Sequence, residues 1–295
     1  MSWQAAEVST NVVGRAARSR LVSRFLRDKI AMTALVFLVA LVVIAIFAPE
    51  IAPRSPTQNF PAINAGPSGA HWLGTDWIGR DVLTRLMYGA RVSLEASFSS
   101  VVLATIVALP LGLIAGYFSG PTDNVLMRIM DALFAFPPLL FAIVIVELRG
   151  KSLHNVILAI AVTFIPGMVR VIRGQVLSVR EETYIEASRS AGAGPARMVS
   201  RHVLPNVASP LIVQSALAFG YAILGEAGLS FLGLGVQPPT PSWGVMLQEQ
   251  YTYVLSNAWG AIVPGVAIAL TVLSFNLVGD GMRDALGRER VAGKA

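Results

Sequence analysis

The chain has 295 residues, of which 54% are hydrophobic and only 14% are charged. A soluble domain of this size carries about 25% charged residues, so the composition excludes an ordinary soluble protein and favours an integral membrane protein. The chain contains no cysteine, which excludes disulfides, thiolate metal sites and a cysteine nucleophile. The net charge of +6 is explained by membrane topology, and we expect no nucleic-acid partner.

Six apolar stretches follow one another along the chain, each with roughly the length needed to cross the hydrocarbon core as a helix. They cover residues 30–48, 96–118, 129–146, 156–169, 207–225 and 258–279. Five of them contain proline, which neighbouring helices in a bundle can accommodate. Gly112 and Gly116 have the spacing of a close helix contact. The sequence therefore predicts an all-α integral membrane protein with six transmembrane helices.

The basic residues predict the orientation of these helices. If the N-terminus is cytoplasmic, 17 of the 23 lysines and arginines fall on the cytoplasmic side and 6 fall outside, as the positive-inside rule requires. The expected organisation, with both termini in the cytoplasm, is a cytoplasmic segment (1–29), a first transmembrane helix (30–48), an extracytoplasmic loop (49–92), a core of five transmembrane helices (93–282) and a cytoplasmic tail (283–295).

Three segments between the apolar stretches have their own patterns. Residues 82–88 predict a short amphipathic helix on the outer surface, before the second transmembrane helix. The segment 226–257 is rich in glycine, proline and aromatic residues, which predicts a re-entrant or capping element on the outer face. The segment 178–206 is a charged cytoplasmic loop.

The first half of the cytoplasmic loop predicts a helix. Residues 178–191 lack proline and glycine, and small or apolar side chains recur along one helical stripe. Glu186 and Arg189 are three residues apart, so they can form an ion pair on its surface.

The second half of the loop carries the signals of a turn and a second helix. Gly192 can end the first helix in a left-handed cap, and Pro195 suits the first turn of the next. Pro205 disfavours helix at the residue before it, so the second helix should stop there. Such a hairpin can stabilise the bundle at the membrane surface or dock a cytoplasmic partner.

The motif E-A-S-x3-G-x9-H-x-L-P, from Glu186 to Pro205, resembles the EAA loop of permease subunits in ABC importers. The usual form is E-A-A-x3-G-x9-I-x-L-P, so Ser188 and His202 are departures. Three further words, HWLGTDWIGRDVLTRLMYGARVSL (71–94), LGEAGLSFLGLGVQPPTPSWG (224–244) and NLVGDGMRDAL (276–286), resemble the C-type permease subunit of dipeptide, oligopeptide and nickel importers. The resemblance runs from about residue 20 to 287, after which Gly287-Arg288 replaces a frequent Asp-Pro.

This resemblance implies a type I ABC importer permease fold in the bacterial inner membrane, translocating short peptides into the cytoplasm. The implied partners are a second (B-type) permease, two cytoplasmic ABC ATPases that bind ATP and magnesium, and an extracytoplasmic peptide-binding protein, within membrane lipid. The ATPases would be contacted through a coupling helix in the EAA loop. The coupling residues carried over are Tyr184, Glu186, Ala187, Ser188, Gly192, Arg201, His202 and Pro205. The motifs leave nickel or another small cargo open.

Three charged residues are candidates for the substrate path. Glu226 lies at the outer end of the fifth apolar stretch, and an acid at a membrane boundary indicates function. It can meet a peptide amino group, or it can form a structural ion pair with Arg85 or Arg91. Arg91 is a second candidate, and Asp131, the acid of the third apolar stretch, is the third.

The remaining motifs exclude an enzyme. Gly150-Lys151-Ser152 ends like a Walker A motif, but that motif needs a glycine five residues earlier, where Ile145 stands. The three histidines are scattered, so we expect no metal site, no cofactor and no catalytic residue on this chain. The rival classes are a secondary transporter, which would show inverted repeats and paired intramembrane charges, and a membrane scaffold without transport.

Overall fold

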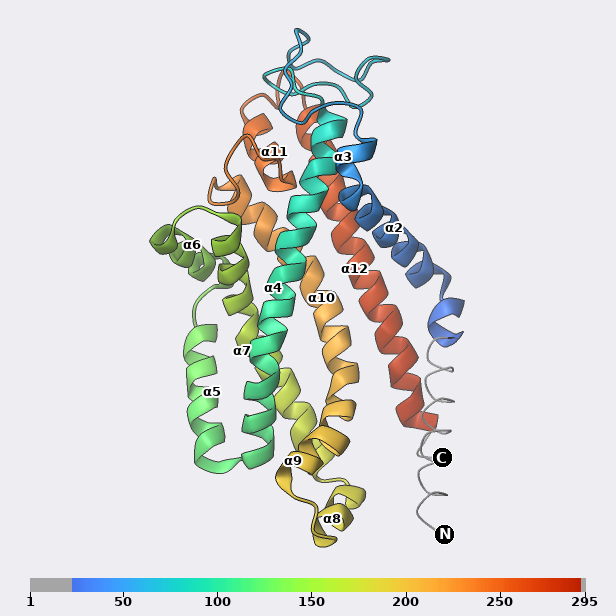
Figure 1. Cartoon of the computed structure of the whole chain (residues 1–295), viewed down its shortest axis with the longest axis vertical. Coiled ribbons are helices and arrows are strands. Elements are labelled where there is room, and N and C mark those ends of the chain that lie inside the picture. Colours follow the sequence, from blue (N-terminus) through green and yellow to red (C-terminus); the bar gives the residue numbers. More distant parts are fainter. Residues whose placement is uncertain (1–22, 293–295) are drawn as a thin grey trace.

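A computed structural model describes residues 23–292 of the chain, with side-chain surroundings up to Leu286. The described part is an elongated bundle of helices without strands, and its connecting segments gather at the two ends (Figure 1). The basic residues before position 23 and Lys294 of the tail lie outside the described residues, so the terminal segments 1–29 and 283–295 are covered only in part.

Five helical segments are long and apolar enough to cross a membrane. They are α2 (Lys29–Ile46), α4 (Val82–Phe118), α7 (Leu153–Arg180), the continuous segment Pro195–Phe231, and α12 (Trp259–Ala292). A sixth crossing is formed if α5 (Gly120–Phe134) and α6 (Pro138–Arg149) are counted together. The short helices are α3 (Ala48–Ile51), α8 (Thr183–Ser190) and α11 (Trp243–Tyr251). The all-α fold expected from the sequence is confirmed.

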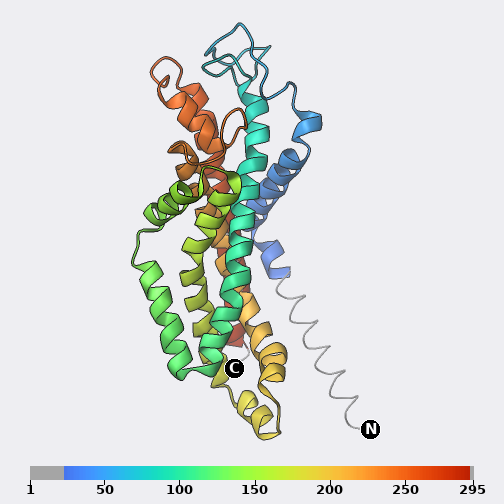
Figure 2. The ribbon, with the colours of Figure 1, turned by 60° about the vertical axis from the view of Figure 1, so that its left-hand side comes forward.

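The sequence predicted one straight helix over the third apolar stretch. The structure instead has two helices, α5 and α6, whose axes differ in direction by 86°. The break covers residues 135–137, directly before Pro138, which begins α6. Pro137 and Pro138 explain the break, because proline has no N–H for the helical ladder and disfavours helix at the preceding residue. Figure 2 shows α5 upright at the edge of the bundle and α6 running across it.

The contact between α4 and α7 is the centre of the fold. A Cβ atom added at Gly112 would lie 2.6 Å from Cβ of Ile172, and one added at Gly116 would lie 2.6 Å from Cβ of Val176. The two glycines therefore let the helix backbones approach closely, as their spacing predicted. Around this contact lies the largest apolar core, which extends to Ile185, Met198 and Val203 in the segment 178–206.

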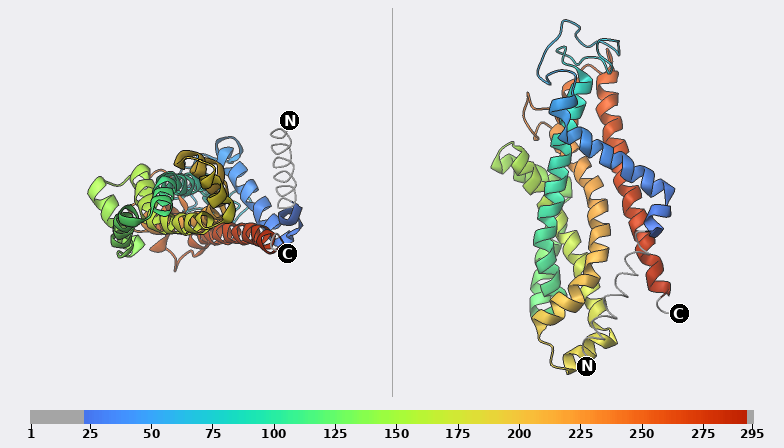
Figure 3. Two further views of the ribbon diagram at one scale, coloured as in Figure 1. Left: turned by 90° about the horizontal axis from the view of Figure 1, so that it is seen from below. Right: turned by 45° about the vertical axis from the view of Figure 1, so that its right-hand side comes forward.

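The short helix expected at residues 82–88 is not separate, because it forms the first turns of the 37-residue helix α4. Asp81 caps this helix by accepting a hydrogen bond from the backbone N–H of Thr84, at 2.9 Å. At the opposite edge of the bundle from α5, α2 crosses α12 obliquely (Figure 3).

Candidate coupling loop and substrate path

We call residues 178–206 the coupling loop, and its first helix is shorter than expected. Helix α7 ends at Arg180, Glu182 is extended, and α8 begins at Thr183, so residues 178–191 are not one helix. The break turns α8 so that Ile185 is buried in the main apolar core. Tyr184 and Ala187, which belong to the expected helical stripe, are instead exposed. The burial of Ile185 explains why the helix does not continue straight.

Gly192 ends α8 as expected, with a positive φ of 84°. Its N–H donates to the carbonyl of Arg189, and the N–H of Ala193 donates to the carbonyl of Ser188, both at about 3 Å. These two bonds form a Schellman motif, which uses a left-handed residue to satisfy the last carbonyls of a helix. The turn between the two helices of the loop therefore has a fixed geometry.

The expected stop before Pro205 is absent. Helix α9 (Pro195–Met198) passes through a π-helical segment, Val199–Val203, directly into α10 (Leu204–Phe231). The N–H of Leu204 donates to the carbonyl of Val199, five residues earlier. Pro205 then lies in the first turn of α10. The wider π-helical turn lets the helix continue past Pro205, where the sequence predicted that it would end.

The loop has a buried side and an exposed side. Ile185, Met198 and Val203 anchor it in the main core. Of the eight coupling residues, Tyr184, Glu186, Ala187, Gly192, Arg201 and Pro205 are exposed, and Ser188 and His202 are half-buried. Burial raises the pKa of Tyr184. Among the described residues, the expected ion pair between Glu186 and Arg189 is not formed.

Polar contacts join the two halves of the loop. Asn206 Nδ2 donates to the carbonyl of His202 at 2.7 Å and to the hydroxyl of Tyr184 at 3.2 Å. The rings of Tyr184 and His202 are 6.0 Å apart, and the Ser188 hydroxyl donates to the carbonyl of Tyr184. The structure therefore brings both departures from the usual motif, Ser188 and His202, close to Tyr184.

The C-terminal ends of α4 and α7 and the N-terminal end of α5 are joined by what we call the inner cluster: Ser119, Asp123, Arg173 and Arg180. Arg173 forms two hydrogen bonds of 2.6 Å with the carboxylate of Asp123. Arg180 donates to the Ser119 hydroxyl at 2.6 Å and to the carbonyl of Tyr117 at 3.2 Å. The last residue of α7 thus holds the end of α4, and only two residues separate it from the start of α8.

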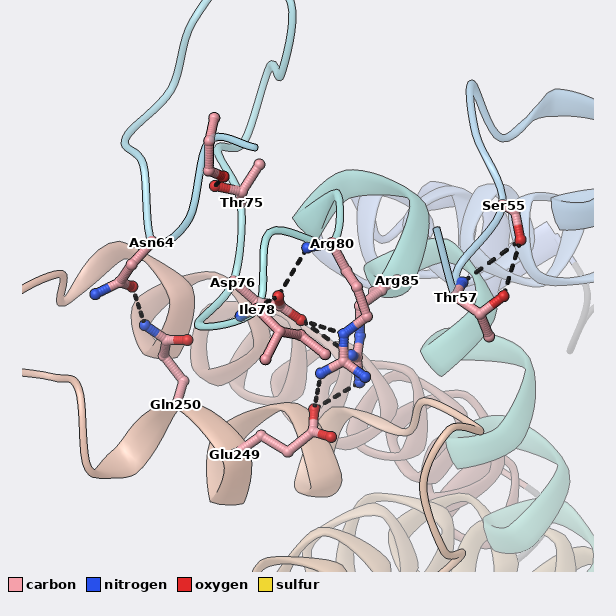
Figure 4. A network of polar contacts seen from close by, with 11 residues as sticks. Ser55, Thr57, Asn64, Thr75, Asp76, Ile78, Arg80, Arg85, Glu249 and Gln250 are labelled. Carbon is pink, nitrogen blue, oxygen red and sulfur yellow. Dashed lines mark hydrogen bonds and ion pairs between the residues drawn. The ribbon is translucent and has the colours of Figure 1, made fainter. Parts of the chain in front are cut away.

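At the end of the bundle opposite residues 178–206, the buried Asp76, Arg80 and Arg85 and the half-buried Glu249 form what we call the outer cluster (Figure 4). Arg80 and Arg85 each contact Asp76, at 2.6 and 3.0 Å, and Glu249, at 2.8 and 2.7 Å. The cluster ties the segment between α3 and α4, and α4 itself, to α11. Burial raises the pKa of Glu249, and the neighbouring Arg80 opposes that rise.

Glu226 is 1% exposed and is surrounded by hydroxyl groups. It accepts hydrogen bonds from Ser93 of α4 at 2.8 Å and from Ser230 of α10 at 2.6 Å. Ser93 in turn accepts from the backbone N–H of Trp243 at 3.2 Å. The expected ion pair with Arg85 or Arg91 is wrong, because Arg85 belongs to the outer cluster and Glu226 connects α4, α10 and α11 instead.

The other two substrate-path candidates lie elsewhere. Arg91 lines an apolar cavity of about 670 Å³ between α2, α4, α10 and α12, with Glu95 beside it. Asp131 of α5 forms an ion pair of 2.7 Å with Arg170 of α7. The structure therefore places Glu226, Arg91 and Asp131 at three separate positions. The partner of Asp131 is Arg170.

Within the described range, no group of three or more histidine and acidic side chains has the arrangement of a metal site.

Comparison with known proteins decides the family. Residues 108–291 match the model described as "Binding-protein-dependent transport system inner membrane component". The chain belongs to this family of membrane permeases. Residues 19–67 also match the "N-terminal TM domain of oligopeptide transport permease C". The permease is thus a multi-pass inner-membrane component of an ABC transport system, and it is not the ATPase.

Two relatives align with nearly the whole permease. It is 44% identical over 265 residues to a glutathione transport system permease protein of Pectobacterium atrosepticum, covering 89% of this chain and 88% of the relative. It is 45% identical over 261 residues to a dipeptide transport system permease protein of Alkalihalophilus pseudofirmus, covering 88% and 86%.

A solved structure shares the fold of the permease. The MetNI methionine ABC transporter in an inward-facing conformation matches with a TM-score of 0.58 and 18% identity, covering 68% of this chain and 95% of the solved one. This similarity confirms the importer permease fold that the EAA resemblance implied.

Sequence reasoning missed both charge clusters of the permease. Arg173 and Arg180 counted only as charges that set topology, and Asp76 and Glu249 received no role. The one signal for the outer cluster was the word at 71–94, which holds Asp76, Arg80 and Arg85. Glu249 is more than 160 residues from both arginines, so no local pattern could pair them.

Proposed function

We propose that the permease forms part of the pore of an ABC importer that moves short peptides into the cytoplasm. The observation that carries this proposal is the 44–45% identity, along almost the whole chain, to permeases named for glutathione and for dipeptides. Both cargoes are small peptides with free charged ends. Similarity to both systems along nearly the whole chain favours the class of cargo that they share.

The partners follow from the same assignment. We infer a second, B-type permease that completes the pore, two cytoplasmic ABC ATPases that bind ATP and magnesium, and an extracytoplasmic peptide-binding protein, all at a membrane in which both termini of this chain are cytoplasmic. The exposed polar side of the cytoplasmic loop supports an ATPase contact, because a solvated hairpin that only stabilised the bundle would need no fixed turn.

The coupling residues form the contact with one ATPase in this proposal. Ile185, Met198 and Val203 fix the loop to the bundle, and the Schellman turn at Gly192 fixes the angle between its two halves. A displacement of the loop by the ATPase is then passed to α7 and α10 as a rigid-body motion. Glu186, exposed on α8, is the polar anchor of the contact.

Two variants test the coupling role. Glu186→Lys reverses a charge on an exposed helix, and Gly192→Asp puts a side chain at a φ of 84°, so both should reach the membrane but lose most of the peptide uptake. The matched control is Gly192→Asn: asparagine and aspartate have nearly the same size and tolerate a left-handed backbone about equally, so a loss of uptake confined to Gly192→Asp is due to its charge. Uptake and ATPase activity are measured in membranes with the whole complex. Normal uptake by Glu186→Lys and Gly192→Asp would contradict the proposal.

The cargo is tested by competition uptake in cells that lack this chain and in complemented cells. We expect dipeptides, tripeptides or glutathione to compete with a labelled dipeptide, and Ni²⁺ to have no effect. Competition by Ni²⁺ alone would assign the permease to nickel instead. Uptake that persists without any copurifying ATPase would indicate a secondary transporter, and a solitary protein without uptake would indicate a scaffold.

For the substrate path, Asp131 has the most support, because it is exposed and paired at a break between two helices. Glu226 and Arg91 stay predictions. Glu226 can reach cargo only if α4, α10 and α11 separate, since its carboxylate is enclosed by Ser93 and Ser230.

A further inference from the structure

The Asp131–Arg170 ion pair lies at the depth of the hydrocarbon core. Asp131 is eleven residues above Gly120, the start of α5, which corresponds to about 16 Å along the helix. Gly112 of α4 contacts Ile172 of α7, so Arg170 lies about 12 Å above Phe118, the inner end of the apolar part of α4. In a hydrocarbon core of about 30 Å, both charges are far from the inner surface.

This ion pair is not enclosed by the chain. The side chain of Asp131 is 60% exposed and that of Arg170 is 39% exposed. Charged side chains at this depth avoid lipid and face a protein interior or a water-filled cavity. A long arginine could reach toward the surface, but Arg170 instead points to Asp131, and an aspartate is too short to do so. The exposed pair must therefore face water or a neighbouring subunit.

The break between α5 and α6 points to the same face. Residues 135–137 are non-helical, and such backbone at membrane depth occurs only inside protein or beside a water-filled cavity. It is not inside this chain, because Phe134, which precedes the break, and Phe136, which lies within it, are 54% and 59% exposed. Arg170 lies 4.4 Å above the ring of Phe134. Broken helices at the membrane midplane are typical of transporter binding sites.

We propose that Asp131, Arg170 and the α5–α6 break form a subsite on the translocation path that binds both charged ends of a short peptide. Asp131 receives the terminal ammonium group, and Arg170 receives the terminal carboxylate. When the peptide binds, the ion pair opens. The Asp131 carboxylate then pairs with the peptide ammonium group, and the Arg170 guanidinium pairs with the peptide carboxylate. Phe134 and Phe136 pack against the cargo side chains. This subsite rests on the proposed function, since it takes peptides as cargo.

The first test compares free dipeptides with their N-acetylated and C-amidated forms, in membranes carrying the whole complex and its binding protein. Asp131→Asn should lose at least about tenfold in uptake of free and amidated peptides but little in uptake of acetylated ones. Arg170→Gln should show the converse. The same binding protein delivers cargo to every variant, so its own preference cancels in the ratio of variant to wild type.

The matched control is the other ion pair between the same two helices. Asp123→Asn and Arg173→Gln remove a pair of the inner cluster that is nearer the cytoplasm and less exposed. They should lower uptake of all three peptide forms equally, as a structural defect does. Equal losses for all three forms in Asp131→Asn and Arg170→Gln as well would overturn the subsite.

A second measurement does not depend on uptake. The chain has no cysteine, so Phe136→Cys introduces a single reactive thiol. A water-soluble maleimide should label it in membranes carrying the whole complex, and saturating dipeptide should slow the labelling several-fold. No labelling, or labelling that dipeptide does not slow, would contradict the subsite. If wild-type membranes import no peptide at all, the proposed function itself fails.

Discussion

Glu249 shows how a single acid is held at the outer end of the permease. Its carboxylate is largely buried and contacts two arginines, which in turn share Asp76, so the outer cluster has two positive and two negative groups. Removing one member of a buried pair leaves an uncompensated charge, which costs more than the pair contributes. Removing any residue of the cluster therefore leaves its two partners with an uncompensated charge.

The raised pKa of Glu249 predicts a pH dependence of stability. The folded protein binds the proton of Glu249 at a higher pH than the unfolded chain does. The contribution of this group to the free energy of unfolding therefore falls as pH rises from 4.5 through the raised value. Glu249→Gln cannot titrate, so the unfolding temperature of wild type minus that of the variant should decrease over this window.

Thermal unfolding in detergent at a series of pH values measures this difference. Glu50→Gln, which removes an exposed acid on α3, is the control for losing one carboxylate. A Glu249→Gln difference that rises with pH would show that the arginines outweigh burial at this site.

At the scale of elements, the α4–α7 contact holds the bundle together. Gly112 and Gly116 face Ile172 and Val176, and the inner cluster fixes the cytoplasmic ends of the same two helices. Since α8 follows α7 after two residues, any motion of the coupling loop reaches α4 through this contact. Along their length the two helices are held by the close approach of their backbones, and the inner cluster adds polar contacts at one end.

Gly116→Ala tests this contact. The added Cβ would lie 2.6 Å from Cβ of Val176, so the helices must move apart, and overpacking of this kind costs about 1–3 kcal/mol. The control is Gly174→Ala, because a Cβ at Gly174 of α7 meets nothing within 4 Å. Unfolding temperature in detergent should fall for Gly116→Ala and stay near wild type for Gly174→Ala. Equal temperatures would mean that the helices are not packed through Gly116.

At the scale of the molecule, the ends of the bundle differ in character. One end carries the coupling loop and the inner cluster, and the other carries the outer cluster and α11 (Figure 1). The positive-inside rule predicts that the coupling loop is cytoplasmic and that the segment around Leu255 faces outward.

Single cysteines test this orientation in a chain that has none of its own. Leu255→Cys is fully exposed in the outer segment and should react with a membrane-impermeant maleimide in spheroplasts. Ser190→Cys, exposed at the end of α8, should react only after permeabilisation. The reverse pattern would invert the proposed topology.

The sequence predicted the helices well where one local pattern was sufficient. Long apolar runs predicted the spans, and Gly192 predicted the end of α8, since both depend on neighbouring residues. It was wrong about the helix ends near Pro205 and Glu182, because a π-helical turn and the burial of Ile185 depend on packing. The partners of Glu226, Asp131 and Glu249 were not predictable, because each lies on a distant helix or loop.

The length of α4 has a mechanical consequence. Arg180 holds its inner end and Glu249 holds Arg85 near its outer end, so the helix connects the two faces of the membrane. Pro110 removes one hydrogen bond of its ladder eight residues from the inner end, which makes it a natural pivot. The arm from Pro110 to Val82 is about 42 Å long. Tilting α4 by about 10° at Pro110 would move its far end by about 7 Å, so we expect a small displacement at the coupling loop to become a larger one at the opposite end of the helix.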